Sequence, residues 1–264
     1  MTSFFICDKI ILVIFVRALI TGASSGLGHD FAIKLAKEGY DLVLVSRNID
    51  KLESLKNELS TNVEIEAIDL SVRENVFKLY EKYRNKIDLL INNAGYGYCG
   101  LFVKTDIDKD LNMLDLNVSC VHILTRLFLD DFVAKNSGQI LNVASLAAFE
   151  PGPLMATYYA TKSYVYNLTM AIYEELRREK SKVKISVLCP GPVDTNFNER
   201  AHVHFSVKAL SSDYVTTYAL KKLKKNKLLI IPGIKMKLSV FFGRFVPRKA
   251  LLKMVYGIQE RKLK

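Results

Sequence analysis

The stretch Thr21-Gly22-Ala23-Ser24-Ser25-Gly26-Leu27-Gly28 decides the fold of this chain of 264 residues. An apolar run that ends at Ile20 precedes it, and apolar residues with helical spacing follow it from Phe31 onwards. The stretch therefore predicts a strand, a tight turn and the start of a helix. The first glycine permits a turn that a side chain would obstruct, and the other two let the backbone approach a pyrophosphate held on the N–H groups of the helix start. Because glycines also interrupt ordinary loops, the motif depends on the flanking strand and helix for its meaning.

Strands and helices alternate along the rest of the chain. Further strands are predicted at 41–46, 63–68, 87–91, 139–143, 183–188 and 227–231. Helices are predicted at 49–59, 72–83, 155–179 and 106–134, the last interrupted at Asn117-Val118-Ser119. This alternation is typical of an α/β fold with a doubly wound (Rossmann-type) parallel sheet, here of seven strands, and with helices on both faces. Ligands of such sheets bind at the carboxyl ends of the strands, where the polar motifs of this chain lie.

The cysteines and the N-terminal leader indicate where the protein works. Cys7, Cys99, Cys120 and Cys189 are scattered and form no CxxC pair, which favours a reducing, cytoplasmic compartment and argues against a metal site. The apolar run 10–16 is too short to span a bilayer, and no basic region or cleavage site typical of a signal peptide accompanies it. We therefore expect residues 1–15 to be a short leader and the start of a buried first strand.

Positive charge is concentrated in the last quarter of the chain. The formal net charge is +11, but residues 200–264 carry 16 Lys and Arg against only Asp213 and Glu260, whereas residues 1–199 carry 22 basic against 25 acidic residues. The basic character is therefore not a property of the nucleotide-binding body.

Three side chains have the chemistry of a carbonyl reduction. Tyr158 and Lys162 are four residues apart on one predicted helix, so both project from the same face, and Ser145 follows a strand end. A phenol is a poor acid with an ordinary pKa of about 10, and a nearby ammonium is expected to lower that pKa. A hydroxyl such as Ser145 can hold a substrate oxygen. Taken alone, Tyr158 and Tyr159 would be core aromatics and Lys162 a solvated charge; together with the glycine turn they favour an active site.

These motifs together resemble the short-chain dehydrogenase/reductase family in its standard-length branch. The resemblance covers residues 17 to about 197 and rests on Thr21–Gly28 (TGxxxGxG), Asp69-Leu70-Ser71, Asn92-Asn93-Ala94-Gly95, Asn117, Ser145, Tyr158-x-x-x-Lys162 and Pro190-Gly191-Pro192-Val193-Asp194-Thr195. Each motif is weak alone, but their order and spacing are specific.

The resemblance implies a role for each matching residue. The implied catalytic residues are Asn117, which positions a relay water, Ser145, which orients the carbonyl, Tyr158, the general acid and base, and Lys162, which lowers the pKa of that tyrosine. Besides Tyr158 and Lys162, the implied cofactor-binding residues are Gly22, Ser24, Ser25, Gly26, Leu27, Gly28, Asp69, Leu70, Asn93, Ala94, Gly95, Pro190, Gly191, Val193 and Thr195. It also implies a small-molecule carbonyl or alcohol substrate and a homo-oligomer.

The choice of cofactor can be argued from charge at the end of the second strand. An acidic residue there would bind the ribose hydroxyls of NAD and repel a 2′-phosphate. Here the sequence reads Ser46-Arg47-Asn48, and Arg47 supplies a permanent planar cation suited to phosphate. The sequence predicts NADP(H), without excluding NAD(H) if Arg47 only caps the strand end.

The stretch 144–158 most resembles a bacterial subgroup of uncharacterised oxidoreductases. That subgroup is more distantly similar to hydroxysteroid dehydrogenases and long-chain ketoacyl reductases, which suggests a hydrophobic substrate. The fold and the motifs identify the reaction but not the molecule.

We predict that the chain after the leader has two parts. Residues 16–234 form a Rossmann-type body, and residues 235–264 form a basic amphipathic helical segment. Within the body, a substrate lid is expected at about 195–215, where Phe205, Val207 and Leu210 line the substrate pocket or pack in the loop. The segment 235–264 interleaves lysines and arginines with Leu238, Phe241, Phe242 and Phe245, and Leu251, Leu252, Val255 and Ile258 follow at helical spacing. Such a segment either lies on an anionic membrane, giving peripheral membrane association, or packs on the protein. No nucleic-acid reading motif accompanies it.

Two other functions compete with the NADP(H)-dependent reductase. A catalytically silent NADP(H)-sensing protein is the first, although a binder has no need for all four catalytic residues. A membrane-surface interaction protein on the same scaffold is the second.

Overall fold

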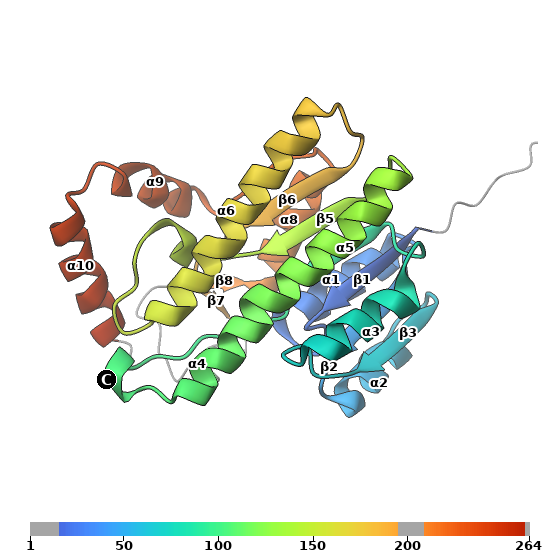
Figure 1. The fold of residues 1–264 in the computed structure, drawn as a ribbon, viewed down its shortest axis with the longest axis horizontal. Helices are drawn as coiled ribbons and strands as arrows, with labels where there is room; N and C mark the ends of the chain where they lie inside the picture. The colour runs from blue at the N-terminus through green and yellow to red at the C-terminus, as the bar shows by residue number, and fades with distance from the viewer. Residues whose placement is uncertain (1–15, 195–208, 262–264) are drawn as a thin grey trace, which may run out of the picture.

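The computed structural model describes residues 16–194 and 209–261, in which a parallel sheet is covered by helices on both faces (Figure 1). Its strands are β1 (Arg17–Thr21), β2 (Asp41–Ser46), β3 (Val63–Ala67), β4 (Leu89–Asn92), β5 (Gln139–Val143), β6 (Lys184–Leu188) and β9 (Leu229–Ile230). Their order is β3-β2-β1-β4-β5-β6-β9, and every neighbouring pair is parallel. The predicted seven-stranded, doubly wound sheet is confirmed.

Helices lie at the positions that the apolar spacing predicts, and one further helix, Ser212–Leu223, begins where the end of the substrate lid, and no helix, was predicted from the sequence. They are α1 (Gly26–Lys37), α2 (Ile49–Glu58), α3 (Arg73–Tyr83), α4 (Ile107–Leu114), α5 (Val121–Ala134), α6 (Ala156–Arg178), α8 (Ser212–Leu223), α9 (Ile234–Gly243) and α10 (Arg248–Glu260), with short 3₁₀ turns η1 (Phe102–Lys104) and η3 (Leu146–Phe149). The first strand begins at Arg17; the part of the predicted strand and leader at 1–15 lies outside the described residues.

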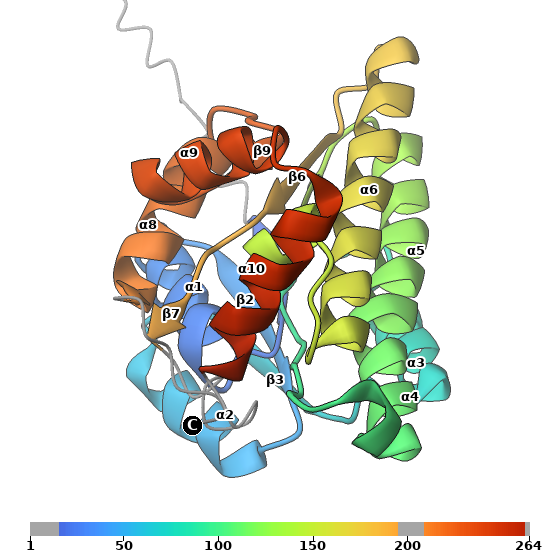
Figure 2. The ribbon, with the colours of Figure 1, turned by 90° about the vertical axis from the view of Figure 1, so that its left-hand side faces the viewer.

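Two apolar layers enclose the sheet, because successive strand side chains point to opposite faces. Ala18 and Ile20 of β1 pack with α1, α2 and α8 on one face, whereas Leu19 between them packs with α3, α5 and α6 on the other. Figure 2 shows α1, α2 and α8 on one side and α3, α5 and α6 on the other. Strands buried on both faces explain why these segments read as continuous apolar runs rather than as alternating ones.

The predicted break in the long helix at Asn117 is a π-helical turn, η2 (Asp115–Cys120), between α4 and α5. The three segments follow one another without a loop, so the sequence located the irregularity correctly and the structure shows its type. Such turns widen a helix by one residue and are frequent at functional sites.

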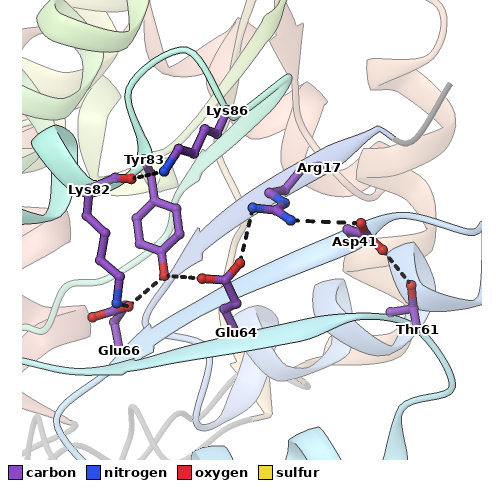
Figure 3. A network of polar contacts seen from close by, with 8 residues as sticks. All are labelled: Arg17, Asp41, Thr61, Glu64, Glu66, Lys82, Tyr83 and Lys86. Atoms are coloured by element: carbon purple, nitrogen blue, oxygen red, sulfur yellow. Dashed lines mark hydrogen bonds and ion pairs between the residues drawn. The ribbon is translucent and has the colours of Figure 1, made fainter.

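A polar network holds β1, β3 and α3 together at the edge of the sheet (Figure 3). The Tyr83 hydroxyl lies 2.6 Å from an oxygen of Glu66 and 3.0 Å from one of Glu64, and both carboxylates accept from it. Glu64 in turn pairs with Arg17 at 3.1 Å, and Glu66 pairs with Lys82 at 2.5 Å. The network thus connects the first and third strands to the end of α3.

The last two helices lie together at one end of the molecule, on the left of Figure 1 and facing the viewer in Figure 2. Helix α10 packs on the body through Leu251 and Val255, whereas α9 contains no buried residue. Among the described residues, none of the helices combines the length and apolar character needed to cross a membrane.

Candidate active site

The turn after β1 requires its glycines for steric reasons. Gly22 has a φ of +67° and Gly26 a φ of +55°, which other residues rarely adopt. A Cβ on Gly22 would lie 2.9 Å from the Cα of Ala94, and a Cβ on Gly28 would lie 2.2 Å from the carbonyl oxygen of Gly22. The turn therefore packs directly against the backbone after β4, and α1 packs directly against the turn.

The first turn of α1 is open to an anion. Its N-cap residue, Ser25, makes no side-chain capping hydrogen bond, and the first turn holds no acidic residue. The amide N–H groups at a helix start carry partial positive charge and bind phosphate groups well. The turn and the helix start thus form a cradle that fits the pyrophosphate of a dinucleotide.

Side chains fix the two central strands to each other at the cradle. The Thr21 hydroxyl accepts hydrogen bonds from the backbone N–H groups of Asn93 at 2.9 Å and Ala94 at 3.0 Å. The Asn93 amide donates to the carbonyl oxygens of Thr21 at 2.9 Å and Gly22 at 3.2 Å. The strand order reverses between β1 and β4, the place at which doubly wound sheets bind their ligands.

The end of β2 presents a cation to the same cleft. Arg47 has a side chain 64% exposed and lies 3.7 Å from a carboxylate oxygen of Asp69. Burial alone would raise the pKa of Asp69, but hydrogen bonds from Ser71 and the Arg47 guanidinium bring that pKa below its ordinary value. Ser46 donates to the hydroxyl of Ser24 at 2.7 Å, so the end of β2 also contacts the glycine turn.

Ser145, Tyr158 and Lys162 converge at the carboxyl end of β5. The Ser145 hydroxyl is hydrogen-bonded to the Tyr158 phenol, and the Lys162 Nζ lies 5.8 Å from the centroid of the tyrosine ring. Lys162 is held there by a 3.0 Å hydrogen bond from its Nζ to the carbonyl oxygen of Val143. The phenol, the ammonium and the hydroxyl are thus neighbours, as the sequence predicts.

Burial controls the ionisation of these groups. Burial raises the pKa of Tyr158 to about 12, and the hydrogen bond with Ser145 acts in the opposite direction. Burial likewise lowers the pKa of Lys162 to about 8. The sequence predicts a lowered tyrosine pKa; in the structure the pKa is raised, because loss of solvent outweighs the nearby polar groups.

The side chain of Asn117 joins two segments of the chain by hydrogen bonds. Its side chain, fully buried in the π-helical turn, accepts from the Tyr96 N–H at 3.1 Å and donates to the Tyr96 carbonyl at 2.8 Å. It also donates to the hydroxyl of Thr161, which neighbours Lys162 on α6, at 3.1 Å. Asn117 therefore joins the segment after β4 to the catalytic helix, and its predicted role in positioning a water stays a prediction.

One cavity of about 1680 Å³ joins the cradle, Arg47 and the catalytic group. The predicted site residues that line it are Gly22, Ser24, Ser25, Gly26, Leu27, Arg47, Asp69, Leu70, Asn93, Ala94, Gly95, Ser145, Tyr158, Lys162, Pro190, Gly191 and Val193. Gly28 and Asn117 are buried and do not line it, and Thr195 lies outside the described residues.

The far end of the cavity is apolar, and most of its lining was not predicted. Met155 at the N-cap of α6 and Tyr159 within α6 meet Leu251, Val255 and Ile258 from α10 there. The helical spacing of the α10 residues was visible in the sequence, but not the surface they face. No pattern in the sequence predicts that the C-terminal helix closes this apolar end of the cavity.

A buried hydrogen bond fixes α10 beside the catalytic helix. Gln259, which is almost fully buried, donates from its Nε2 to the hydroxyl of Tyr159. Tyr159 directly follows Tyr158, so this hydrogen bond links the position of α10 to that of Tyr158.

Of the three apolar residues placed in the predicted lid, the structure describes only Leu210, and its position agrees with packing in the protein and not with a place in the pocket wall. Leu210 belongs to a short strand, β8 (Leu210–Ser211), paired with β7 (Val193–Asp194), and packs against the core between the sheet and α8. It does not line the cavity. Phe205 and Val207 lie outside the described residues.

The thiol of Cys189 lies near Ser145 and Lys162. Cys99, Cys120 and Cys189 are buried and form no disulfide bond within the described residues, and burial raises the pKa of Cys189 to about 12. Within 16–194 and 209–261, no three His, Cys, Asp or Glu side chains gather as metal ligands would.

The fold and this site define an oxidoreductase that binds a nicotinamide dinucleotide. The family model for short chain dehydrogenases matches residues 16–204, so the chain belongs to the short-chain dehydrogenase/reductase family. An uncharacterized oxidoreductase of Staphylococcus epidermidis is 33% identical over 186 residues, which are 69% of this chain and 80% of that protein. The predicted likeness to bacterial uncharacterised oxidoreductases is thereby confirmed.

Solved structures agree with this assignment. A short-chain dehydrogenase from Sphingobium yanoikuyae in complex with NADPH is 28% identical, with a TM-score of 0.79 over 88% of this chain and 94% of that one. A short-chain dehydrogenase/reductase from Burkholderia phymatum in complex with NAD is 25% identical, with a TM-score of 0.78 over 86% and 92% of the two chains.

Proposed function

We propose that this protein is an NADP(H)-dependent oxidoreductase that transfers hydride between the nicotinamide and a carbonyl or alcohol carbon, with Tyr158 as general acid and base. The observation that carries the proposal is the hydrogen bond between Ser145 and Tyr158, with buried Lys162 beside the ring, in the cavity that contains the glycine cradle. A protein that only sensed the nucleotide would have no need of this group.

Each residue has a defined task in the proposed reaction. The nicotinamide, when bound, supplies or accepts the hydride. Ser145 holds the substrate oxygen, and Tyr158 gives that oxygen its proton in reduction and removes it in oxidation. Lys162, when protonated, stabilises the phenolate that remains. Asn117 keeps the catalytic helix in register with the segment after β4.

The substrate we propose is hydrophobic. The end of the cavity beyond Tyr158 is walled by Met155, Leu251, Val255 and Ile258, which offer apolar surface and few hydrogen-bonding groups. A substrate stripped of water there gains from the burial of its own apolar surface.

Replacing Tyr158 by Phe tests the reaction. The Tyr158→Phe variant loses the proton donor but keeps the ring, so we expect turnover to fall by roughly a hundredfold or more while NADPH still binds. NADPH oxidation is followed against aldehydes, ketosteroids, quinones and ketoacyl thioesters, and NADPH binding by fluorescence titration. The matched control is Tyr164→Phe, an exposed tyrosine further along α6. Equal turnover in Tyr158→Phe and wild type would overturn the proposal in favour of another proton donor.

The preference for NADP(H) rests on Arg47. Its exposed guanidinium lies at the cavity wall beside Asp69, where a 2′-phosphate would compete with the carboxylate for it. We expect Arg47→Ala to raise the KM for NADPH by roughly tenfold or more and to leave that for NADH nearly unchanged. Lys51→Ala, which removes an exposed cation from the neighbouring helix α2, is the control. An unchanged ratio of the two constants in Arg47→Ala would show that this residue does not select the cofactor.

A further inference from the structure

Helix α9 exposes apolar side chains that nothing in the described protein covers. Phe241, Phe242 and Phe245 are 53%, 59% and 72% exposed, and Leu238 and Ile234 beside them are also exposed. The Phe241 ring contacts the rings of Phe242 and Phe245 edge to face, with centroids 5.3 Å and 5.6 Å apart. Monomeric proteins rarely leave so continuous an aromatic surface in water, which marks it as an interaction surface.

The charge around this surface has one sign. Between residues 234 and 259 the chain carries Lys235, Lys237, Arg244, Arg248, Lys249 and Lys253 and no acidic residue. All six cations are exposed. The surface of α9 and α10 is therefore both apolar and strongly basic.

Helix α9 contacts the body beside η3 through Met236 and Val240, and α10 follows it. Leu251 and Val255 anchor α10 in the core beside Tyr158, and Gln259 fastens its end to Tyr159. The phenylalanine side chains of this region stay exposed, and α9 and α10 lie together at the end of the molecule that faces the viewer in Figure 2.

The occupant of this surface must be anionic and apolar at once. A second copy of the chain placed face to face would bring six cations against six, which disfavours self-association. A helix of ten residues is about 15 Å long and lies in an interface instead of crossing it. We propose that α9 and the basic residues around it dock the protein on a bilayer surface that carries anionic lipids.

The proposed docking surface lies beside the opening of the cavity. Phe242, Arg244, Arg248 and Met254 line the cavity and are also exposed on this surface, so the cavity opens beside it. If the proposed function holds, an apolar substrate enters the site from the lipid phase. The docking itself is measured without turnover and does not depend on the reaction.

Vesicle flotation of the full-length protein tests the proposal. Vesicles of phosphatidylcholine alone are compared with vesicles that contain phosphatidylglycerol. The variant Phe241→Ser/Phe245→Ser removes two rings that do not line the cavity, and we expect it to lower binding to the anionic vesicles by roughly tenfold or more. Phe77→Ser, which removes a ring that is 48% exposed on α3, is the control and should bind like wild type.

The charge is tested separately. Lys249→Glu/Lys253→Glu should lower binding to the anionic vesicles by roughly tenfold and leave the weak binding to phosphatidylcholine unchanged, whereas Lys78→Glu on α3 should have little effect. Each variant must retain wild-type NADPH binding, which shows that it folds. Wild type that fails to float with anionic vesicles overturns the proposal. Sedimentation tests the alternative that this face joins two copies of the chain. The proposal is overturned if wild type does not bind vesicles and the phenylalanine variant has a smaller association state than wild type.

Discussion

Burial decides the protonation states of Tyr158 and Lys162. A buried phenol resists losing its proton and a buried amine resists gaining one, so the pKa of Tyr158 rises to about 12 and that of Lys162 falls to about 8, and the two values move apart from ordinary values around 10. Tyr158 is consequently protonated throughout the neutral range, as a proton donor in reduction must be. Lys162 changes charge much closer to neutral pH than an exposed lysine does.

The reaction should therefore depend on pH through Lys162. The ammonium is present below about pH 8 and is lost above it, so kcat/KM for carbonyl reduction should fall as the pH rises through about 8, whereas Tyr158 remains protonated to about 12. The measurement is a pH profile of NADPH-dependent reduction between about pH 6 and pH 10. The Lys162→Met variant should have a lower kcat/KM at every pH, and its kcat/KM should not fall as the pH rises through about 8. A wild-type profile that stays flat to about pH 10 would mean that the charge on Lys162 does not assist the reaction.

Among individual residues, the motif residues were predictable and their surroundings were not. The spacing of Tyr158 and Lys162 follows from helix geometry, so sequence alone placed them on one face. The sequence predicts the wrong direction for the pKa shift of Tyr158, because that direction depends on how much solvent is excluded from the phenol. Solvent exclusion is produced by segments far away in the chain, such as α10.

At the scale of elements, the strand–turn–helix unit around β1 and α1 shows how closely backbone segments can approach. Gly28 has no room for a side chain because the carbonyl oxygen of Gly22 occupies that space. Gly257 in α10 is the opposite case, with no heavy atom within 4 Å of the position of a Cβ. The same residue type is thus essential in one helix and replaceable in another.

Alanine substitutions at these two glycines should have opposite effects. We expect Gly28→Ala to destabilise the protein by about 1–3 kcal/mol and to weaken NADPH binding, because the turn must move away from the helix. Gly257→Ala should stabilise it by up to about 1 kcal/mol, because alanine is the better helix former. Urea unfolding and NADPH titration measure both variants. A Gly28→Ala protein with wild-type stability and affinity would contradict the close packing of α1 on the turn.

The sequence predicts where the π-helical turn at Asp115–Cys120 lies, but it does not predict that the turn is π-helical. Asn117 interrupts an apolar helical pattern, which the sequence shows. The extra residue in the turn rests on contacts with Tyr96 and Thr161, which lie 21 and 44 positions away. Local preference alone does not produce this geometry.

At the scale of the whole molecule, the network around Tyr83 joins parts of the chain that the sequence does not connect. Arg17, Glu64 and Tyr83 come from β1, β3 and α3, and Tyr83 is almost fully buried. Without the phenol, the carboxylates of Glu64 and Glu66 would lose a shared donor in a partly buried place. None of these residues lines the cavity, so the network serves stability and not the reaction.

Removing the Tyr83 hydroxyl should lower stability without changing catalysis. We expect Tyr83→Phe to reduce the free energy of unfolding by about 1–3 kcal/mol, because two acceptors lose their donor. Urea denaturation measures the change, and kcat at saturating substrate should equal that of wild type. Tyr214→Phe, at an exposed position on α8, is the control and should unfold like wild type. Equal stability of Tyr83→Phe and wild type would show that the network contributes no net free energy.

The sequence by itself determined the fold class, the order of strands and helices, the glycine cradle, and the membership of Ser145, Tyr158 and Lys162 in one site. These features follow from local periodicity, from steric limits on the backbone and from motif spacing, all of which are written in neighbouring residues. Only the tertiary structure decided that α10 packs beside Tyr159 to close the cavity, that α9 remains uncovered, and that burial raises the pKa of Tyr158. The physical reason is that burial and solvent exclusion arise between segments distant in sequence, and no local pattern states which apolar face meets which.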